Sequence, residues 1–258
     1  MGNFLYTVTS EYGFMLKPML AGGALNIALV CLAFIALILV AYLLGSINFA
    51  IVISGRKYKE DIRTHGSKNA GMTNMMRTYG KSAAVLTLVG DALKAILSCI
   101  IGYLIMGQLG AYAAGLFCML GHVFPLYYGF KGGKGVVTAA ATVLMTDPLV
   151  FLILLTLFII IVAIWRFISL ASIICMGLYP LILSFTSKFA TMIATGEAKP
   201  SIGILFAIFM AVLIIGKHWS NIKRLREGTE SKFSFKKSVK APKKEDAKIN
   251  ENESNEEK

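Results

Sequence analysis

The chain of 258 residues is 56% hydrophobic and carries 26 lysines and arginines against 14 aspartates and glutamates, a formal net charge of +12. Soluble domains rarely place this much apolar sequence in long uninterrupted blocks, which are typical of helices that cross a membrane. The composition therefore excludes a soluble domain and predicts an all-α polytopic membrane protein. Most basic residues lie at alternate ends of the apolar segments, as the positive-inside rule describes, so the charge requires no nucleic-acid partner.

Residues 1–24 precede the first apolar block and are expected to form a short extension on the outer side of the membrane or an interfacial segment. They do not match a cleavable signal sequence, because they contain no basic n-region, and the first apolar block begins well into the chain and is long enough to span a membrane. Seven membrane-spanning segments are predicted after them, at residues 25–54, 82–106, 110–128, 135–146, 149–165, 167–187 and 201–217.

The basic loops set the predicted orientation of these segments. An odd number of spans with the basic loops inside places the N-terminus outside and the C-terminus in the cytoplasm. One integral membrane domain is predicted over residues 25–230. Residues 231–258 contain many lysines, glutamates and asparagines and few apolar residues, so they are expected to form a disordered charged cytoplasmic tail.

The fourth predicted span, residues 135–146, is too short to cross a hydrocarbon core of about 30 Å as an upright helix. Its many small residues favour close packing against neighbouring helices. The sequence leaves open whether this segment is tilted, shielded by its neighbours or placed in a thinned region of the membrane.

Four polar clusters lie on the predicted cytoplasmic side. Each residue alone has an ordinary structural explanation, such as a helix cap, a turn or a bond to a backbone carbonyl. Together, hydroxyls, amides, guanidinium groups and glycine turns suit a phosphate dianion. The clusters are residues 45–49 with Arg56; residues 61–63 with 66–74; residues 122–135; and Arg166, Ser169 and Ser172 with His218, Asn221, Arg224 and Glu230.

The third cluster contains the loop Gly129-Phe130-Lys131-Gly132-Gly133-Lys134-Gly135 between two apolar segments. Glycines let a backbone turn sharply and approach a ligand, and lysines supply compact positive charge for phosphate. We interpret the loop as a phosphate cradle formed by its two lysines and by the N–H groups of Gly132, Gly133 and Gly135. A positive-inside anchor with a glycine hinge is the alternative.

Other kinds of site lack their sequence patterns. The spacing around Lys134 is not that of a nucleotide-binding P-loop, and no predicted strand precedes it. No histidine is followed by an aspartate five positions later, which excludes the H-x₄-D acyltransferases. Histidines and cysteines show no metal-ligand spacing, so no metal or cofactor is expected. Asp91 and Lys94, three positions apart within a predicted span, are interpreted as a structural or site-supporting pair.

In this order, the clusters resemble the motifs of the bacterial acyl-phosphate-dependent glycerol-3-phosphate acyltransferases over about residues 45–230. The family sequences GSIPF…DIR…GSGNIGATN and GHxFPxFLxFKGGKG appear here as GSINF…DIR…GSKNAGMTN and GHVFPLYYGFKGGKG. The patterns R-Y-x-S-L-x-S and HRxNIxRLxxGxE correspond to residues 166–172 and 218–230. The chain departs from the family at Asn48, Lys68 and Met72, where proline, glycine and alanine are usual.

The resemblance implies a seven-helix enzyme of the bacterial plasma membrane whose active site faces the cytoplasm. It implies transfer of a fatty acyl group from acyl phosphate to the 1-hydroxyl of sn-glycerol 3-phosphate, giving lysophosphatidic acid and phosphate in phospholipid biosynthesis, with no cofactor and no obligate protein partner. The catalytic residues it implies are Ser46, Arg56, Lys131, Ser169, His218 and Asn221. Those implied to bind substrate are Arg63, Asn69, Thr73, Asn74, Gly132, Gly133, Lys134 and Gly135. The general base is left open between His218 and a phosphate oxygen of the substrate.

Two other functions use the same basic face. A transporter for a phosphorylated metabolite needs polar access from outside as well, and few polar residues lie in the outer halves of the second, third and sixth predicted spans. A scaffold that binds anionic lipid needs the charge but not the serine, histidine and asparagine pattern. Alanine at those positions would leave a scaffold unaffected.

Overall fold

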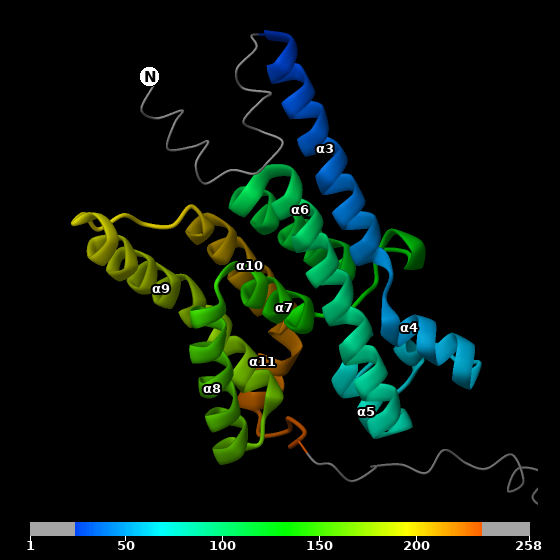
Figure 1. The fold of residues 1–258 in the computed structure, drawn as a ribbon. Coiled ribbons are helices and arrows are strands. Elements are labelled where there is room, and N and C mark those ends of the chain that lie inside the picture. The colour runs from blue at the N-terminus through cyan, green and yellow to red at the C-terminus, as the bar shows by residue number, and fades with distance from the viewer. Residues whose placement is uncertain (1–23, 234–258) are drawn as a thin grey trace, which may run out of the picture.

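The structure is a computed structural model that describes residues 24–233. The predicted outer extension up to residue 23 and the tail from residue 234 lie outside the described residues. Within 24–233 every regular element is a helix, which confirms the all-α prediction (Figure 1). The elements are α3 (Ala24–Ser46), α4 (Phe49–Ile53), the π-helix η1 (Ser54–Tyr58), the 3₁₀-helix η2 (Ile62–Thr64), α5 (Met72–Tyr79), α6 (Lys81–Val123), the 3₁₀-helix η3 (Leu126–Tyr128), α7 (Val136–Thr146), α8 (Pro148–Trp165), α9 (Ile168–Thr195), α10 (Gly203–Lys217) and α11 (Trp219–Arg226).

The prediction of a multi-pass membrane protein is confirmed. In the described part of the chain, four helices are long and apolar enough to cross a membrane. They become five if α10 and α11, which meet at a bend of 56°, form one broken span. The count of seven spans and the orientation of the two termini stay predictions.

Helix α6 contains two of the predicted spans, joined by a sharp turn. The backbone leaves helical geometry at Met106 and Gly107, where Gly107 has φ of 60°. The two halves then pack against each other so closely that a Cβ added at Gly102 would lie 2.2 Å from the carbonyl oxygen of Gly110. A glycine allows the positive φ, and glycines at the crossing allow the two backbones to touch.

A side chain at this crossing is expected to destabilise the protein. Gly102→Val places methyl groups against the Gly110 backbone, and overpacking of this kind costs about 1–3 kcal/mol. We expect a lower thermal unfolding midpoint in lipid–detergent micelles. Gly177→Val in α9 is the matched control, because a Cβ at Gly177 meets nothing closer than 4.0 Å. Equal midpoints for the two variants would contradict the close packing.

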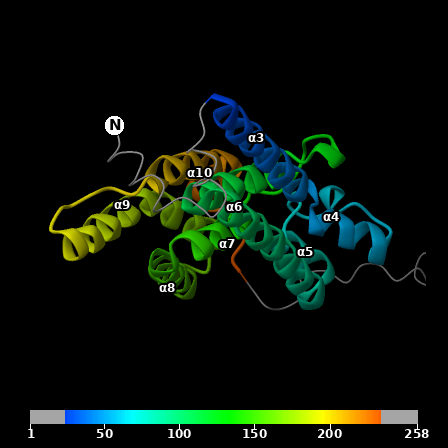
Figure 2. The same cartoon turned by 45° about the horizontal axis from the view of Figure 1, so that its top comes forward.

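The short helix α7 is shielded by its neighbours, which is one of the three arrangements that its length left open. It contacts α6 on one side and α8 on the other, and both views show it among these helices (Figures 1 and 2). Thr138, Ala139, Thr142 and Val143 are buried, and Gly115 of α6 packs against Thr142. Small side chains therefore let an 11-residue helix lie within the bundle.

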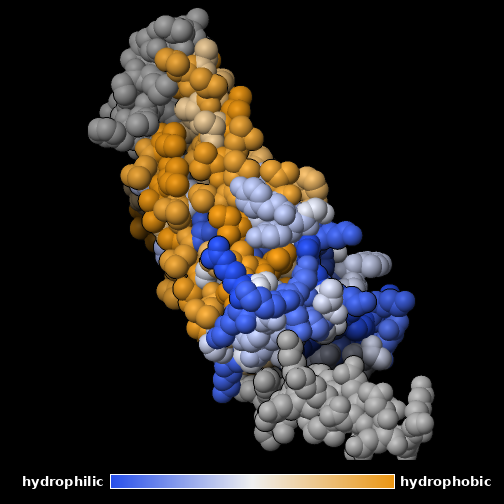
Figure 3. Space-filling model, turned by 90° about the vertical axis from the view of Figure 1, so that its right-hand side faces the viewer, coloured by the Kyte–Doolittle hydropathy of each residue, from blue (hydrophilic) through white to orange (hydrophobic). Residues whose placement is uncertain are grey.

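The surface divides into an apolar region and a polar end. Seen from the side that carries α3 and α4, apolar residues cover most of the molecule and polar residues gather at the end beyond α4 (Figure 3). Large exposed apolar side chains occur on most of the long helices, including Leu32, Leu104, Leu149, Leu181 and Val212. Apolar side chains facing outward suit a lipid environment.

Candidate functional site

The site begins where α3 breaks into α4. Ser46 ends α3 and is buried. Its hydroxyl donates to the Tyr42 carbonyl at 2.9 Å and accepts from the Leu126 N–H at 3.2 Å. Ser46 thus joins the helix break to the segment that leads into the glycine-rich loop.

Asn48 stands where the family usually has proline, and here it forms the N-cap of α4. Its Oδ1 accepts from the Ile51 N–H at 3.2 Å, and its Nδ2 donates to the Ala70 carbonyl at 3.2 Å. The side chain is fully buried. The amide therefore both starts the helix and holds the 66–74 loop.

Removal of this amide is expected to loosen the helix break. Asn48→Ala leaves a buried N–H and a buried carbonyl without their partners, which costs about 1–3 kcal/mol. We expect a lower thermal midpoint and a several-fold loss of activity. Thr87→Ala is the control, because Thr87 is equally buried but bonds only the Ala83 carbonyl within its own helix. A loss no larger than that of the control would contradict the role of Asn48.

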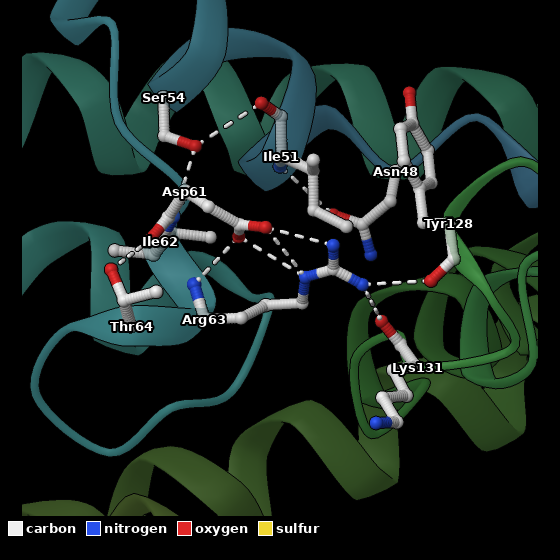
Figure 4. A network of polar contacts seen from close by, with 9 residues as sticks. All are labelled: Asn48, Ile51, Ser54, Asp61, Ile62, Arg63, Thr64, Tyr128 and Lys131. Carbon is white, nitrogen blue, oxygen red and sulfur yellow. Dashed lines mark hydrogen bonds and ion pairs between the residues drawn. The ribbon is translucent and has the colours of Figure 1, made fainter.

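Arg63 holds the backbone of the loop that follows η3 (Figure 4). Its guanidinium pairs with Asp61 at 2.8 Å and donates to the carbonyls of Tyr128 at 2.8 Å and Lys131 at 3.0 Å. The hydrogen bond from Arg63 lowers the pKa of Asp61. The sequence predicts that Arg63 binds substrate. In this structure its guanidinium bonds Asp61 and the backbone of the loop.

Asn74 has a similar structural role in the 62–74 loop. Its Oδ1 accepts from the Ser67 N–H, and its Nδ2 donates to the carbonyls of Ile62, His65 and Asn69. Lys68, at a position where the family usually has glycine, adopts φ of 57° in this loop. Lys68 therefore keeps the left-handed backbone conformation that glycine adopts easily, although a residue with a side chain adopts it at a steric cost.

The glycine-rich loop differs from the predicted cradle in one respect. The N–H groups of Gly132 and Gly133, expected to face phosphate, donate to the carbonyls of Val123 at 3.3 Å and His122 at 3.1 Å. A Cβ at Gly132 would lie 2.1 Å from the His122 oxygen, so glycine is needed for close packing there. Gly135 has φ of 83° and begins α7. In this structure the N–H groups of Gly132 and Gly133 are bonded to backbone carbonyls, and their role in binding substrate stays a prediction.

The two lysines of the loop differ in exposure. Lys131 is exposed, as is Arg56 on η1. Lys134 is partly buried, and its ammonium donates to Oδ1 of Asn221. Burial, together with the nearby Arg224, Arg77 and Lys217, lowers the pKa of Lys134 to about 8. Lys134 is thus the loop cation that faces the C-terminal cluster.

The C-terminal cluster is organised around Glu230, which the sequence prediction did not include among the site residues. Its carboxylate accepts from Ser169 Oγ, Asn221 Nδ2 and Arg224 Nε, each at 2.7 Å. Burial raises the pKa of Glu230, but these hydrogen bonds outweigh burial and lower it. The signal in the sequence was its place in the fourth polar cluster and at the end of the family pattern over residues 218–230. Five polar side chains therefore meet, from the loop before α7, from α9, from α11 and from the chain after α11.

His218 lies at the bend between α10 and α11 and is buried. Its Nδ1 is 2.8 Å from the Ile214 carbonyl, so Nδ1 carries the hydrogen in this contact. In the neutral ring this leaves Nε2 as the acceptor, which is the form a general base needs.

These groups line the polar end of a cavity of about 710 Å³. Apolar residues of α6, α7 and α8, including Leu88, Ile96, Val137 and Phe158, line the rest. The predicted residues among its walls are Asn69, Thr73, Asn74, Lys134, Gly135, Ser169, His218 and Asn221. Those outside its walls are Ser46, Arg56, Arg63, Lys131, Gly132 and Gly133. Among the described residues, no three His, Cys, Asp or Glu side chains are grouped as a metal would require.

A cationic and hydroxyl-lined pocket that continues as an apolar cavity between membrane helices defines a protein that handles an anionic amphiphile. The sequence matches the model of the glycerol-3-phosphate acyltransferase family over residues 35–228. This chain belongs to that family.

Relatives and solved structures agree with this assignment. The chain is 39% identical over 198 residues to a glycerol-3-phosphate acyltransferase of Finegoldia magna, covering 76% of this chain and 93% of that protein. It is 37% identical to one of Clostridioides difficile, covering 80% and 98%. It also resembles the crystal structure of PlsY (YgiH), an integral membrane glycerol 3-phosphate acyltransferase, in its glycerol 3-phosphate form. The two structures superpose with a TM-score of 0.68 at 35% sequence identity. The match covers 78% of this chain and 96% of that one.

Proposed function

We propose that this protein transfers a fatty acyl group from acyl phosphate to the 1-hydroxyl of sn-glycerol 3-phosphate, releasing lysophosphatidic acid and inorganic phosphate. The observation that carries the proposal is the cavity, which joins a cationic polar end to an apolar interior. A polar end of this kind suits phosphate, and the apolar part suits an acyl chain. The related crystal structures are described as glycerol 3-phosphate and lysophosphatidic acid forms of PlsY, which fits both halves of the reaction.

The proposed reaction needs little acid catalysis. Acyl phosphate is a mixed anhydride whose leaving group is already a stable anion. The oxygen of the glycerol 1-hydroxyl attacks the acyl carbon, the bond from that carbon to the phosphate oxygen breaks, and the hydroxyl proton passes to His218 Nε2 or to a phosphate oxygen. The protein has to hold two anionic groups together and stabilise the developing negative charge.

The geometry suggests a division of roles within the site. Lys134, with Ser169 and Asn221, binds a phosphoryl group at the polar end, where Glu230 orients the same serine and asparagine. Arg56 and Lys131 are exposed and attract anions to the entrance. Asn69 and Thr73 line the same end and orient the glycerol.

The cytoplasmic location of the site and the seven-span topology are parts of the same proposal. Their support is the concentration of basic residues near the site, as in Arg56, Lys131 and Arg224. Single cysteines at Lys59 and at Lys199, in a chain whose four native cysteines are replaced, test the orientation in intact cells. An impermeant maleimide should label position 199 and leave position 59 unlabelled, and the opposite pattern would overturn the orientation.

A donor comparison tests the chemistry. The purified protein in lipid receives labelled glycerol 3-phosphate with palmitoyl phosphate, palmitoyl-CoA or palmitoyl acyl carrier protein, and lysophosphatidic acid is measured by mass spectrometry. We expect product from palmitoyl phosphate alone, and loss of product in Ser169→Ala and Asn221→Ala. Product from the thioesters would contradict the proposed donor, and absence of product from folded protein would redirect the search to glycerol 3-phosphate flux into proteoliposomes.

A further inference from the structure

A buried ionic cluster lies in α6, and two of its three members, Asp91 and His122, line the cavity. Lys94 Nζ is 2.9 Å from Asp91 Oδ1 and 3.1 Å from His122 Nδ1, and the His122 nitrogen is 3.3 Å from the same carboxylate oxygen. Each of the three residues is at most 5% exposed. Ionisable groups in a membrane helix are costly and mark functional positions more often than chance.

Lys94 reaches beyond this cluster to the helix break at Ser46. Its ammonium donates to the carbonyls of Gly45 at 2.9 Å and Ile47 at 2.6 Å, one on each side of the serine. The last carbonyls of a helix lack intrahelical partners and carry the negative end of its dipole. Lys94 therefore stabilises the end of α3 and fixes the backbone that presents the Ser46 hydroxyl.

His122 reaches to the glycine-rich loop. Its carbonyl accepts from the Gly133 N–H at 3.1 Å. Its ring packs so closely that a Cβ at Gly133 would lie 2.1 Å from Nε2. The position of the ring, set by Asp91 and Lys94, therefore limits where the loop carrying Lys131 and Lys134 can lie.

We propose that Asp91, Lys94 and His122 form a positioning cluster that couples the Ser46 helix break to the glycine-rich loop. This inference rests on the proposed function, because it assigns the cluster to the same reaction. The three residues act through Ser46 and the loop lysines and contribute no reacting atom. A pair that only supported the fold would need no contact with either motif, yet the cluster contacts both.

The variant Asp91→Asn/Lys94→Met tests the cluster without leaving an unpaired buried charge. We compare it with Lys94→Arg, which keeps the charge, and with Thr87→Ala, which removes a buried polar group from the same helix. Hydrogen exchange followed by mass spectrometry in lipid nanodiscs reports on residues 44–49, residues 130–135 and α9. Acyl transfer kinetics give kcat and the KM for glycerol 3-phosphate.

In the double variant we expect faster exchange in both motifs, unchanged exchange in α9, and kcat/KM at least tenfold lower. Lys94→Arg should recover part of this loss, and Thr87→Ala should resemble the parent protein. Unchanged exchange in the two motifs, or faster exchange throughout α6 and α9 with a matching loss of activity, would overturn the proposal.

Two further results keep the test decisive. If the double variant cannot be isolated in folded form, His122→Asn takes its place, because asparagine retains a polar group near the position of Nδ1. We expect the same faster exchange in residues 130–135. Exchange there at the rate of the parent protein would overturn the coupling. Because exchange is read without substrate, failure of the acyltransferase assay in the parent protein would count against the proposed function alone.

Discussion

Gly133→Ala is expected to lower kcat/KM for glycerol 3-phosphate by at least a hundredfold. The added Cβ would lie 2.1 Å from His122 Nε2 and 2.6 Å from the Ala70 carbonyl oxygen. The backbone oxygen cannot move independently, so the loop itself must shift. A displacement of about 1 Å in a catalytic group can cost about a hundredfold in rate.

Steady-state phosphate release in lipid nanodiscs measures this effect, with the thermal midpoint as a check on folding. Gly55→Ala is the matched control, because it makes the same change at a glycine where a Cβ meets nothing within 4 Å. We expect the control to keep its activity. Retention of kcat/KM within about threefold in folded Gly133→Ala would show that the loop tolerates the shift.

Lys134→Met should produce the second large loss of activity. A charged hydrogen bond contributes about 1.5–3 kcal/mol, and the ammonium is the loop cation inside the cavity wall. We expect kcat/KM to fall by about one to two orders of magnitude, mostly through KM. Lys223→Met is the control, because Lys223 is exposed on α11 and pairs only with Glu227 at 3.9 Å. Equal kcat/KM in the two variants would contradict the assigned role.

The dependence of kcat/KM on pH in the parent protein also tests the role of the Lys134 ammonium. Burial and neighbouring cations lower the pKa of Lys134 to about 8, so the ammonium form is present below pH 8 and is lost above it. The kcat/KM of the parent should therefore fall as the pH rises through about 8. Lys134→Arg, whose guanidinium stays charged, should move this decline to higher pH. An unchanged decline in the arginine variant would assign it to another group.

Hydropathy and charge predicted most of the fold. The long apolar helices follow from uninterrupted apolar sequence, and α8 and α10 begin and end within a few residues of the predicted spans. The turn at Met106 and Gly107 lies between two predicted segments, but their contact at Gly102 and Gly110 depends on tertiary packing. Sequence periodicity does not contain that information.

The site was predicted in composition but less well in contacts. The clusters around Lys134, Ser169 and Asn221 do meet in one cavity. Arg63 and Asn74 instead bond backbone carbonyls of loops, because the folded chain brings these carbonyls within reach of each side chain. The type of a polar residue indicates that it can bind phosphate. Only the folded backbone determines whether its side chain bonds a ligand or a neighbouring carbonyl.

The most direct measurement is phosphate release from palmitoyl phosphate by the purified protein in lipid, with and without glycerol 3-phosphate. If the cavity holds both substrates for acyl transfer, release will depend on glycerol 3-phosphate and will match lysophosphatidic acid mole for mole. Release at the same rate without glycerol 3-phosphate would indicate simple hydrolysis. Such a result, or no release from folded protein, would contradict the acyltransferase function proposed for this site.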